Sequence, residues 1–184
     1  MARKLDLIIV VDVEATCWQG TVPPGQENEI IEIGICPLDV ASGQVLDKDR
    51  ILVRPERSQV SKFCTELTTL TQEQVDRGIT FGEACTLLKK KYKTSDRIWA
   101  SYGDYDRNQF QRQCQSRHIT YPFGPRHINV KSLLAIMYAL PKEVGMSEAL
   151  NLLQLPLIGT HHRGTDDAFN IACILSKLIL GYRN

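Results

Sequence analysis

The stretch LDLIIVVDVE, residues 5–14, decides how this sequence folds. It is rich in β-branched residues and apolar on both faces, which is the pattern of a strand buried at the centre of a sheet. Asp12 and Glu14 stand at its end, two residues apart, so their side chains point to the same face and continue the line of Ile8 and Val10. Open α/β sheets bind ligands beyond the carboxyl ends of their strands. The stretch therefore predicts a central strand with two acids at its ligand-binding end.

The rest of the sequence changes from strand-like to helical periodicity near residue 61, and strands and helices alternate after that point. The expected strands are Leu5–Val13, Glu29–Pro37, Val45–Pro55, Arg97–Tyr102 and His127–Val130. The expected helices are Ser61–Leu67, Thr71–Asp76, Phe81–Lys93, a helix from the Gly103 turn through Ser116, Leu133–Leu140, Ser147–Leu153, and Thr165–Leu180 with Gly181 as its stop. Together they predict one α/β domain, residues 1–184, with a three-strand meander first.

Composition excludes several classes of protein. With 22 Lys and Arg against 21 Asp and Glu the net charge is +1, so non-specific binding to polyanions is not expected and nucleic acid would need a local site. The longest aliphatic run, Leu7–Val11, is far shorter than the ~20 residues of a membrane span, and no signal peptide is recognisable. Six scattered cysteines indicate a reducing compartment, and we expect a cytoplasmic protein.

A third candidate acid follows the fourth expected strand. Asp104 and Asp106 both come after the Gly103 turn, and helical spacing places them on different faces. Asp106 shares a stripe with Phe110 and Cys114 and should face the sheet, whereas Asp104 should face water. Asp106 is therefore the better candidate.

A fourth candidate lies in the segment HHRGTDD, residues 161–167, which opens the last expected helix. Asp167 falls on the same face as the apolar Ile171, so it should point inward at the start of a buried helix. Asp166 aligns with the polar Asn170. The helix macrodipole favours acids here by only ~0.3–1 kcal/mol, which explains Asp166 as a cap but not an acid on the apolar stripe.

Four inward acids are expensive to bury unless cations neutralise them. Carboxylate oxygens without a Cys or His cluster select hard ions such as Mg²⁺ or Mn²⁺, and two such ions ~3.5–4 Å apart stabilise an in-line phosphoryl displacement. A histidine nearby, with a reference pKa of ~6.5, can take a proton from the attacking water. The spacing alone leaves a plainer reading open for Asp12 and Glu14, namely a strand that ends in polar residues.

Three segments resemble the motifs of the DEDDh 3'–5' exonucleases, a superfamily with a ribonuclease H-like fold. VVDVEATC (10–17) is similar to the first motif, GDYD (103–106) with Phe110 to the second, and His162 with Asp167 to the third. Within the superfamily, the chain looks like the Eri-type, or 3' histone-mRNA, exonucleases. That narrower likeness rests on EATC (14–17), NEIIE (28–32), VRP (53–55), FCTELT (63–68), QEQVD (72–76) and GTDD (164–167).

The resemblance implies a mixed five-stranded sheet, a three-strand antiparallel meander plus parallel strands, flanked by helices. It also implies a two-metal 3'–5' exonuclease that releases nucleoside 5'-monophosphates from single-stranded RNA, with DNA less favoured. The ligands of the two Mg²⁺ (or Mn²⁺) ions would be Asp12, Glu14, Asp106 and Asp167. His162 would be the general base, and His161 is out of register and receives no role.

The resemblance further assigns the terminal nucleotide to four residues. They are Ala15, Thr16, Phe63 and Tyr105, the last standing where close members carry Trp. Stacking of a base between Phe63 and Tyr105 would be worth roughly 1–3 kcal/mol without sequence preference. A contact from its helix to the core explains Phe63 equally well.

Other functions stay open on the sequence. The histone-mRNA enzymes carry a further N-terminal nucleic-acid-binding module, whereas the first strand here is expected near Leu5, so we expect a bare catalytic domain. The alternatives are a DNA- or oligonucleotide-directed DEDDh nuclease, a catalytically weak or dead relative that binds nucleic acid or a protein, and a phosphohydrolase of small nucleotides. The presence of all four acids and the histidine argues against a dead relative.

Overall fold

The structure, a computed structural model, describes residues 4–183. The strands in this part of the chain are β1 (Leu7–Ala15), β2 (Ile30–Asp39), β3 (Asp49–Leu52), β4 (Ile98–Ser101) and β5 (His127–Asn129). The helices are α1 (Lys62–Thr68), α2 (Gln72–Asp76), α3 (Phe81–Tyr92), α4 (Tyr105–Arg117), α5 (Val130–Met137), α6 (Met146–Leu152) and α7 (Gly164–Arg183). None of the helices within 4–183 is both long and apolar enough to cross a lipid bilayer.

The strands form one mixed sheet in the order β3-β2-β1-β4-β5. β1 pairs antiparallel with β2, and β2 pairs antiparallel with β3, which makes the predicted meander. On its other side β1 pairs in parallel with β4, and β4 pairs in parallel with β5. The predicted mixed five-stranded sheet is therefore confirmed, with β1 at its centre.

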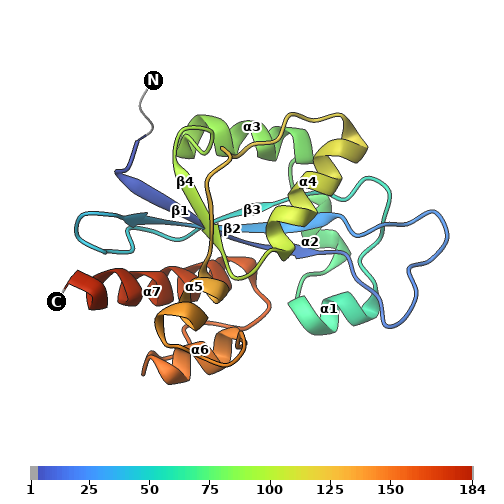
Figure 1. Ribbon diagram of the computed structural model, residues 1–184. Helices are drawn as coiled ribbons and strands as arrows, with labels where there is room; N and C mark the ends of the chain where they lie inside the picture. The colour runs from blue at the N-terminus through green and yellow to red at the C-terminus, as the bar shows by residue number, and fades with distance from the viewer. Residues whose placement is uncertain (1–3, 184) are drawn as a thin grey trace.

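Helices cover both faces of the sheet (Figure 1), and β1 contributes side chains to the two apolar layers in alternation. Ile8 and Val10 pack with residues of α5, α6 and α7 on one face. Ile9 and Val11 pack with residues of α3 and α4 on the other. Burial on both sides explains the unbroken apolar run at the start of this strand. The apolar run ends at Asp12, while the strand continues to Ala15.

Two predicted element bounds are wrong in their extent. The strand expected at Val45–Pro55 is only Asp49–Leu52, because the flanking residues form single bridges rather than a ladder. The helix expected at Leu133–Leu140 begins earlier and spans Val130–Met137, because the Asn129 side chain caps it by accepting the Ser132 N–H.

The last helix is longer than expected. α7 continues through Gly181, the predicted stop, to Arg183. A glycine ends a helix when it adopts the left-handed conformation, and Gly181 keeps a helical one instead.

A close approach between two glycines fixes the start of α7 against β2. A Cβ atom on Gly34 would lie 1.8 Å from the carbonyl oxygen of Gly164. The buried Glu32 carboxylate, two residues before Gly34, accepts the Gly164 N–H at 2.8 Å. Backbone contact and hydrogen bond together set the position of Asp167, which lies one turn into the helix.

We expect Gly34→Ala to lower the free energy of unfolding by about 3 kcal/mol or more, because the added methyl overlaps backbone that cannot move aside. Gly82→Ala is the matched control, since its Cβ would meet only the Ile119 side chain at 3.5 Å. That variant should keep the wild-type stability or gain about 0.5 kcal/mol. Urea unfolding followed by circular dichroism measures both, and equal stability of the two variants would contradict the packing described here.

Candidate active site

The end of β1 presents its two acids on the face that α7 covers. Asp12 is half-buried and Glu14 is buried, and both line a pocket of about 360 Å³. One carboxylate oxygen each of Asp12, Glu14 and Asp167 lie within 4.8 Å of one another. Residues from β1 and α7, distant in sequence, therefore meet at one point.

Asp106 lies in the first turn of α4 and faces the sheet, as its helical position predicted. Its Oδ1 accepts the backbone N–H of Val13 at 2.9 Å, which ties α4 to β1. Asp106 lines the same pocket, although the described carboxylates that meet within 4.8 Å do not include it. Asp104 is about half exposed and pairs with Arg107 at 3.0 Å, so it faces water as expected.

Asp167 points inward from the first turn of α7 and its side chain is only 5% exposed. Its Oδ2 accepts the backbone N–H of His162 at 2.8 Å, whereas its Oδ1 is buried and has no hydrogen-bond partner among residues 4–183. The neighbouring Asp166 lies in the first turn of α7, where the macrodipole favours an acid as expected, but its carboxylate forms its hydrogen bonds outside the helix. Its carboxylate accepts from Lys48 Nζ at 2.8 Å and from the Thr160 N–H at 2.9 Å, because loops that the sequence could not place lie over it.

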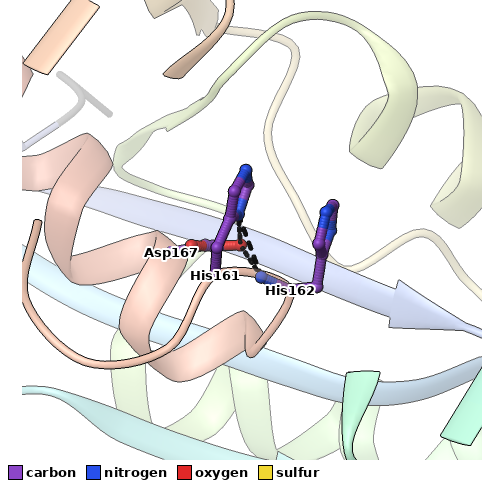
Figure 2. A group of neighbouring side chains, drawn as sticks. All are labelled: His161, His162 and Asp167. Carbon is purple, nitrogen blue, oxygen red and sulfur yellow. Dashed lines mark hydrogen bonds and ion pairs between the residues drawn. The ribbon is translucent and has the colours of Figure 1, made fainter. Parts of the chain in front are cut away.

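The two histidines precede α7 and lie side by side above Asp167 (Figure 2). Their ring centroids are 4.0 Å apart with 5° between the ring planes. His161 Nδ1 lies 3.0 Å from Asp167 Oδ2, and both imidazoles line the pocket. His162 is therefore placed beside the acids as predicted, and His161, which the sequence left without a role, contacts one of them.

Crowding and burial shift the pKa of every acid in the pocket upward. Burial raises the pKa of Asp12 well above its usual range, and the neighbouring Asp106 and Glu14 raise it further. Burial also raises the pKa of Glu14 to about 8, with Asp167 adding to the effect. The pKa of Asp106 rises to about 7 through burial, against the opposing Val13 N–H. Four acids against Lys131 leave this pocket with an excess of negative charge.

The pKa values of Asp167 and His162 move in opposite directions. Burial raises the pKa of Asp167, while contact with His161 and the His162 N–H oppose the rise. Burial lowers the pKa of His162, and the neighbouring His161 lowers it further. His162 therefore carries a neutral imidazole, able to accept a proton, at physiological pH.

The donor set fits hard divalent cations. Carboxylate oxygens are the ligands that Mg²⁺ and Mn²⁺ prefer, and three of them here converge within 4.8 Å. A buried carboxylate oxygen without a partner is costly, and Asp167 Oδ1 is one within the described chain. A cation in the pocket would give that oxygen a partner and would relieve the repulsion between the acids.

Of the four residues expected at the terminal nucleotide, two line the pocket. Ala15 and Tyr105 line the pocket, and Tyr105 is 55% exposed at its rim. Phe63 is exposed on α1, one turn before Leu67, and of the two only Leu67 is among the described residues that line the pocket.

Thr16, the fourth residue expected at the terminal nucleotide, is not among the described residues that line the pocket, and its side chain points away from it. The side chain is fully buried. Its hydroxyl donates to the Glu27 carbonyl at 2.9 Å and accepts the Glu29 N–H at 2.9 Å. The β1–β2 register shifts between Glu14 and Ala15, and the chain beyond it turns toward the 27–29 loop.

Two residues that sequence reasoning left out of the site belong beside it. Glu32 pairs with Glu14 across the β1–β2 ladder, is fully buried, and its charge raises the pKa of Asp12 and Glu14. Glu29 precedes β2, whereas Glu32 lies within it, and only the β1–β2 register reveals that Glu32 faces the acids. Lys131 at the start of α5 lines the pocket and supplies a cation to it.

Comparison with known proteins now decides the family. A family model described as Exonuclease matches residues 9–175. The chain belongs to this exonuclease family. Human 3'-5' exoribonuclease 1 is 34% identical over 190 residues, which cover 95% of this chain and 52% of that protein. The chain thus spans about half the length of the curated mammalian exoribonucleases that it matches.

Solved structures agree with the family assignment. The nuclease domain of 3'hExo, described as a DEDDh family member bound to rAMP, superposes with a TM-score of 0.87 at 31% identity, covering 96% of this chain and 92% of that one. Pop2p of S. pombe, described as the Mg²⁺- and Mn²⁺-bound form, shares the fold alone, with a TM-score of 0.69 at 15% identity over 92% of this chain and 81% of its own. The resemblance to DEDDh exonucleases is confirmed.

Mg²⁺ or Mn²⁺ should raise the melting temperature of this exonuclease-family chain, and chelator should reverse the shift, because a cation relieves the repulsion among the pocket acids. Asp167→Asn should abolish most of the shift, since Asp167 belongs to the converging carboxylates. Asp166→Asn is the matched control and should keep it, because Asp166 pairs with Lys48 outside the pocket. Differential scanning fluorimetry measures all three proteins, and an equal shift in both variants would contradict this assignment.

Proposed function

We propose that this protein is a 3'–5' exonuclease that uses two divalent cations, Mg²⁺ or Mn²⁺, to remove nucleotides from single-stranded RNA. The observation that carries the proposal is the convergence of Asp12, Glu14 and Asp167 within 4.8 Å around the unpartnered, buried Oδ1 of Asp167. His162 lines the same pocket, so a base and a set of cation ligands share one space.

In this reaction Asp12, Glu14, Asp106 and Asp167 hold the cations. When bound, such ions neutralise charge on the phosphate and acidify the attacking water. His162 accepts the proton of that water as the terminal phosphodiester breaks, and its lowered pKa keeps the ring unprotonated and ready to do so. The product is a nucleoside 5'-monophosphate and a chain one residue shorter.

The terminal nucleotide lies at the rim formed by Ala15, Leu67 and Tyr105. Tyr105 offers an exposed aromatic face for stacking against a base. Phe63 lies on α1 one turn before Leu67, so it flanks the same end of the bound RNA. Lys131 contributes a positive charge for a backbone phosphate. Stacking of this kind has no sequence preference, in keeping with an enzyme that works along a chain.

Two further assignments follow at the level of proposal. RNA is the preferred substrate because similar proteins are named exoribonucleases, with DNA ends as the second candidate. The cytoplasm is the proposed location because all six cysteines are free thiols, spread over the chain.

End-labelled single-stranded RNA incubated with Mg²⁺ should be shortened stepwise from its 3' end, and chelator should stop the reaction. His162→Ala should slow it at least ~100-fold, the usual contribution of a general base. The control is His118→Asn, which should keep the wild-type rate. His118 is an exposed histidine at the C-terminus of α4 with a left-handed backbone, a conformation that asparagine tolerates. Internal cuts, or activity that persists in chelator, would overturn the proposal. DNA of the same sequence tests the second substrate.

Removal of the aromatic face of Tyr105 should weaken binding of the RNA end. Tyr105→Ala is expected to raise the KM by about 5- to 150-fold, from a stacking contribution of roughly 1–3 kcal/mol, with a smaller effect on kcat. Tyr105→Phe keeps the ring and should stay close to wild type. A kcat loss with an unchanged KM, or equal KM values for the two variants, would show that the ring does not stack on the substrate.

A further inference from the structure

The pair His161–His162 has an arrangement that needs an explanation beyond general base catalysis. Adjacent side chains of an extended chain point to opposite sides, yet these two rings lie parallel with centroids 4.0 Å apart (Figure 2). The cause is the left-handed backbone of His162, with φ at 64°. Non-glycine residues adopt this conformation at a cost, and such strain concentrates at active sites and ligand clamps.

The strain is held in place by Asp167. Its Oδ2 accepts the backbone N–H of His162 at 2.8 Å, and the same oxygen lies 3.0 Å from His161 Nδ1. The other carboxylate oxygen, Oδ1, is buried and lacks a hydrogen-bond partner within the described part of the chain. One carboxylate thus contacts the His161 imidazole and the His162 backbone and still has a free acceptor atom.

These three side chains have the dimensions of a metal site. One ligand atom each of His161, His162 and Asp167 lie within 4.8 Å of one another. Ligands of a tetrahedral Zn²⁺ ion stand about 3.3 Å apart, given Zn–N distances of about 2.0–2.1 Å. Because the two rings are parallel, their lone pairs lie in parallel planes, and binding one ion requires the His161 ring to turn out of the stack. The His161 side chain is 40% exposed at the end of a loop, which leaves room for that rotation.

The ligand chemistry separates this group from the carboxylate cluster. Imidazole nitrogens favour Zn²⁺ and Co²⁺, whereas Mg²⁺ prefers all-oxygen surroundings. We propose that His161, His162 and Asp167 form a site for one borderline transition-metal ion, Zn²⁺ by chemical class, which shuts off the enzyme. Three protein ligands leave a fourth position open to water from the pocket.

Inhibition follows from the shared residues. Zn²⁺ on this site occupies the lone pair with which His162 would accept a proton, and it draws Asp167 away from Asp12 and Glu14. The inhibitory consequence rests on the proposed nuclease function, whereas the binding itself does not. His161 is the residue that distinguishes the zinc site, because the proposed reaction gives it no part.

Zinc binding is tested by isothermal titration of Zn²⁺ into the protein of residues 1–184 in excess Mg²⁺. The wild type should bind one equivalent, and His161→Ala should weaken that binding at least about tenfold while its circular dichroism spectrum and melting temperature show an intact fold. His118→Asn, an exposed histidine away from the pocket, should bind as the wild type does. Equal zinc affinity of His161→Ala and the wild type would overturn the proposal.

Two further measurements complete the test. Co²⁺ in the site should give visible bands without an intense near-ultraviolet thiolate band, whereas a thiolate band would place the metal on Cys17, which lines the same pocket, and overturn the assignment. In the RNA assay, the zinc concentration for half inhibition, taken against each protein's own zinc-free rate, should rise at least about tenfold in His161→Ala. Tight zinc binding that leaves RNA degradation unchanged would disprove the inhibition but not the zinc site. If the protein degrades no RNA at all, the titration still tests the zinc site by itself.

Discussion

The repulsion between buried carboxylates at the end of β1 is the constraint on which the site depends. Asp12 and Glu14 stand on one face of a strand that is apolar on both sides, and both line the pocket that α7 covers. Asp106 and Asp167 approach from helices on opposite faces of the sheet and raise the pKa values of the first two further. Such a cluster is tolerable when cations neutralise it.

Backbone groups of the scaffold hold two of these acids in place. The Val13 N–H fixes Asp106, and the His162 N–H fixes Asp167. The contact between Gly34 and Gly164 and the buried Glu32 set where α7 begins. Each carboxylate therefore keeps acceptor capacity for a ligand, and this explains how Asp167 Oδ1 stays without a partner in the described structure.

Asp167 is shared by two groups of ligands with different chemistry. With Asp12 and Glu14 it offers oxygen to hard cations, and with His161 and His162 it offers a mixed nitrogen and oxygen set. The same geometry that places His162 beside the acids also places it beside His161, within reach of one metal ion. In the proposed enzyme this would make activity depend on which metal is present.

The sequence by itself determined the order of the elements and the direction of each acid. A period of two placed Asp12 and Glu14 on one face, and a period of 3.6 chose Asp106 over Asp104 and Asp167 over Asp166, because these faces depend only on local backbone geometry. The resemblance to a known family added the order of the motifs. Only the tertiary structure decided the partners across elements. It turned Thr16 into the 27–29 loop, set Glu32 opposite Glu14, paired Asp166 with Lys48, and stacked His161 on His162, because register, loop paths and one strained φ angle have no local sequence signal.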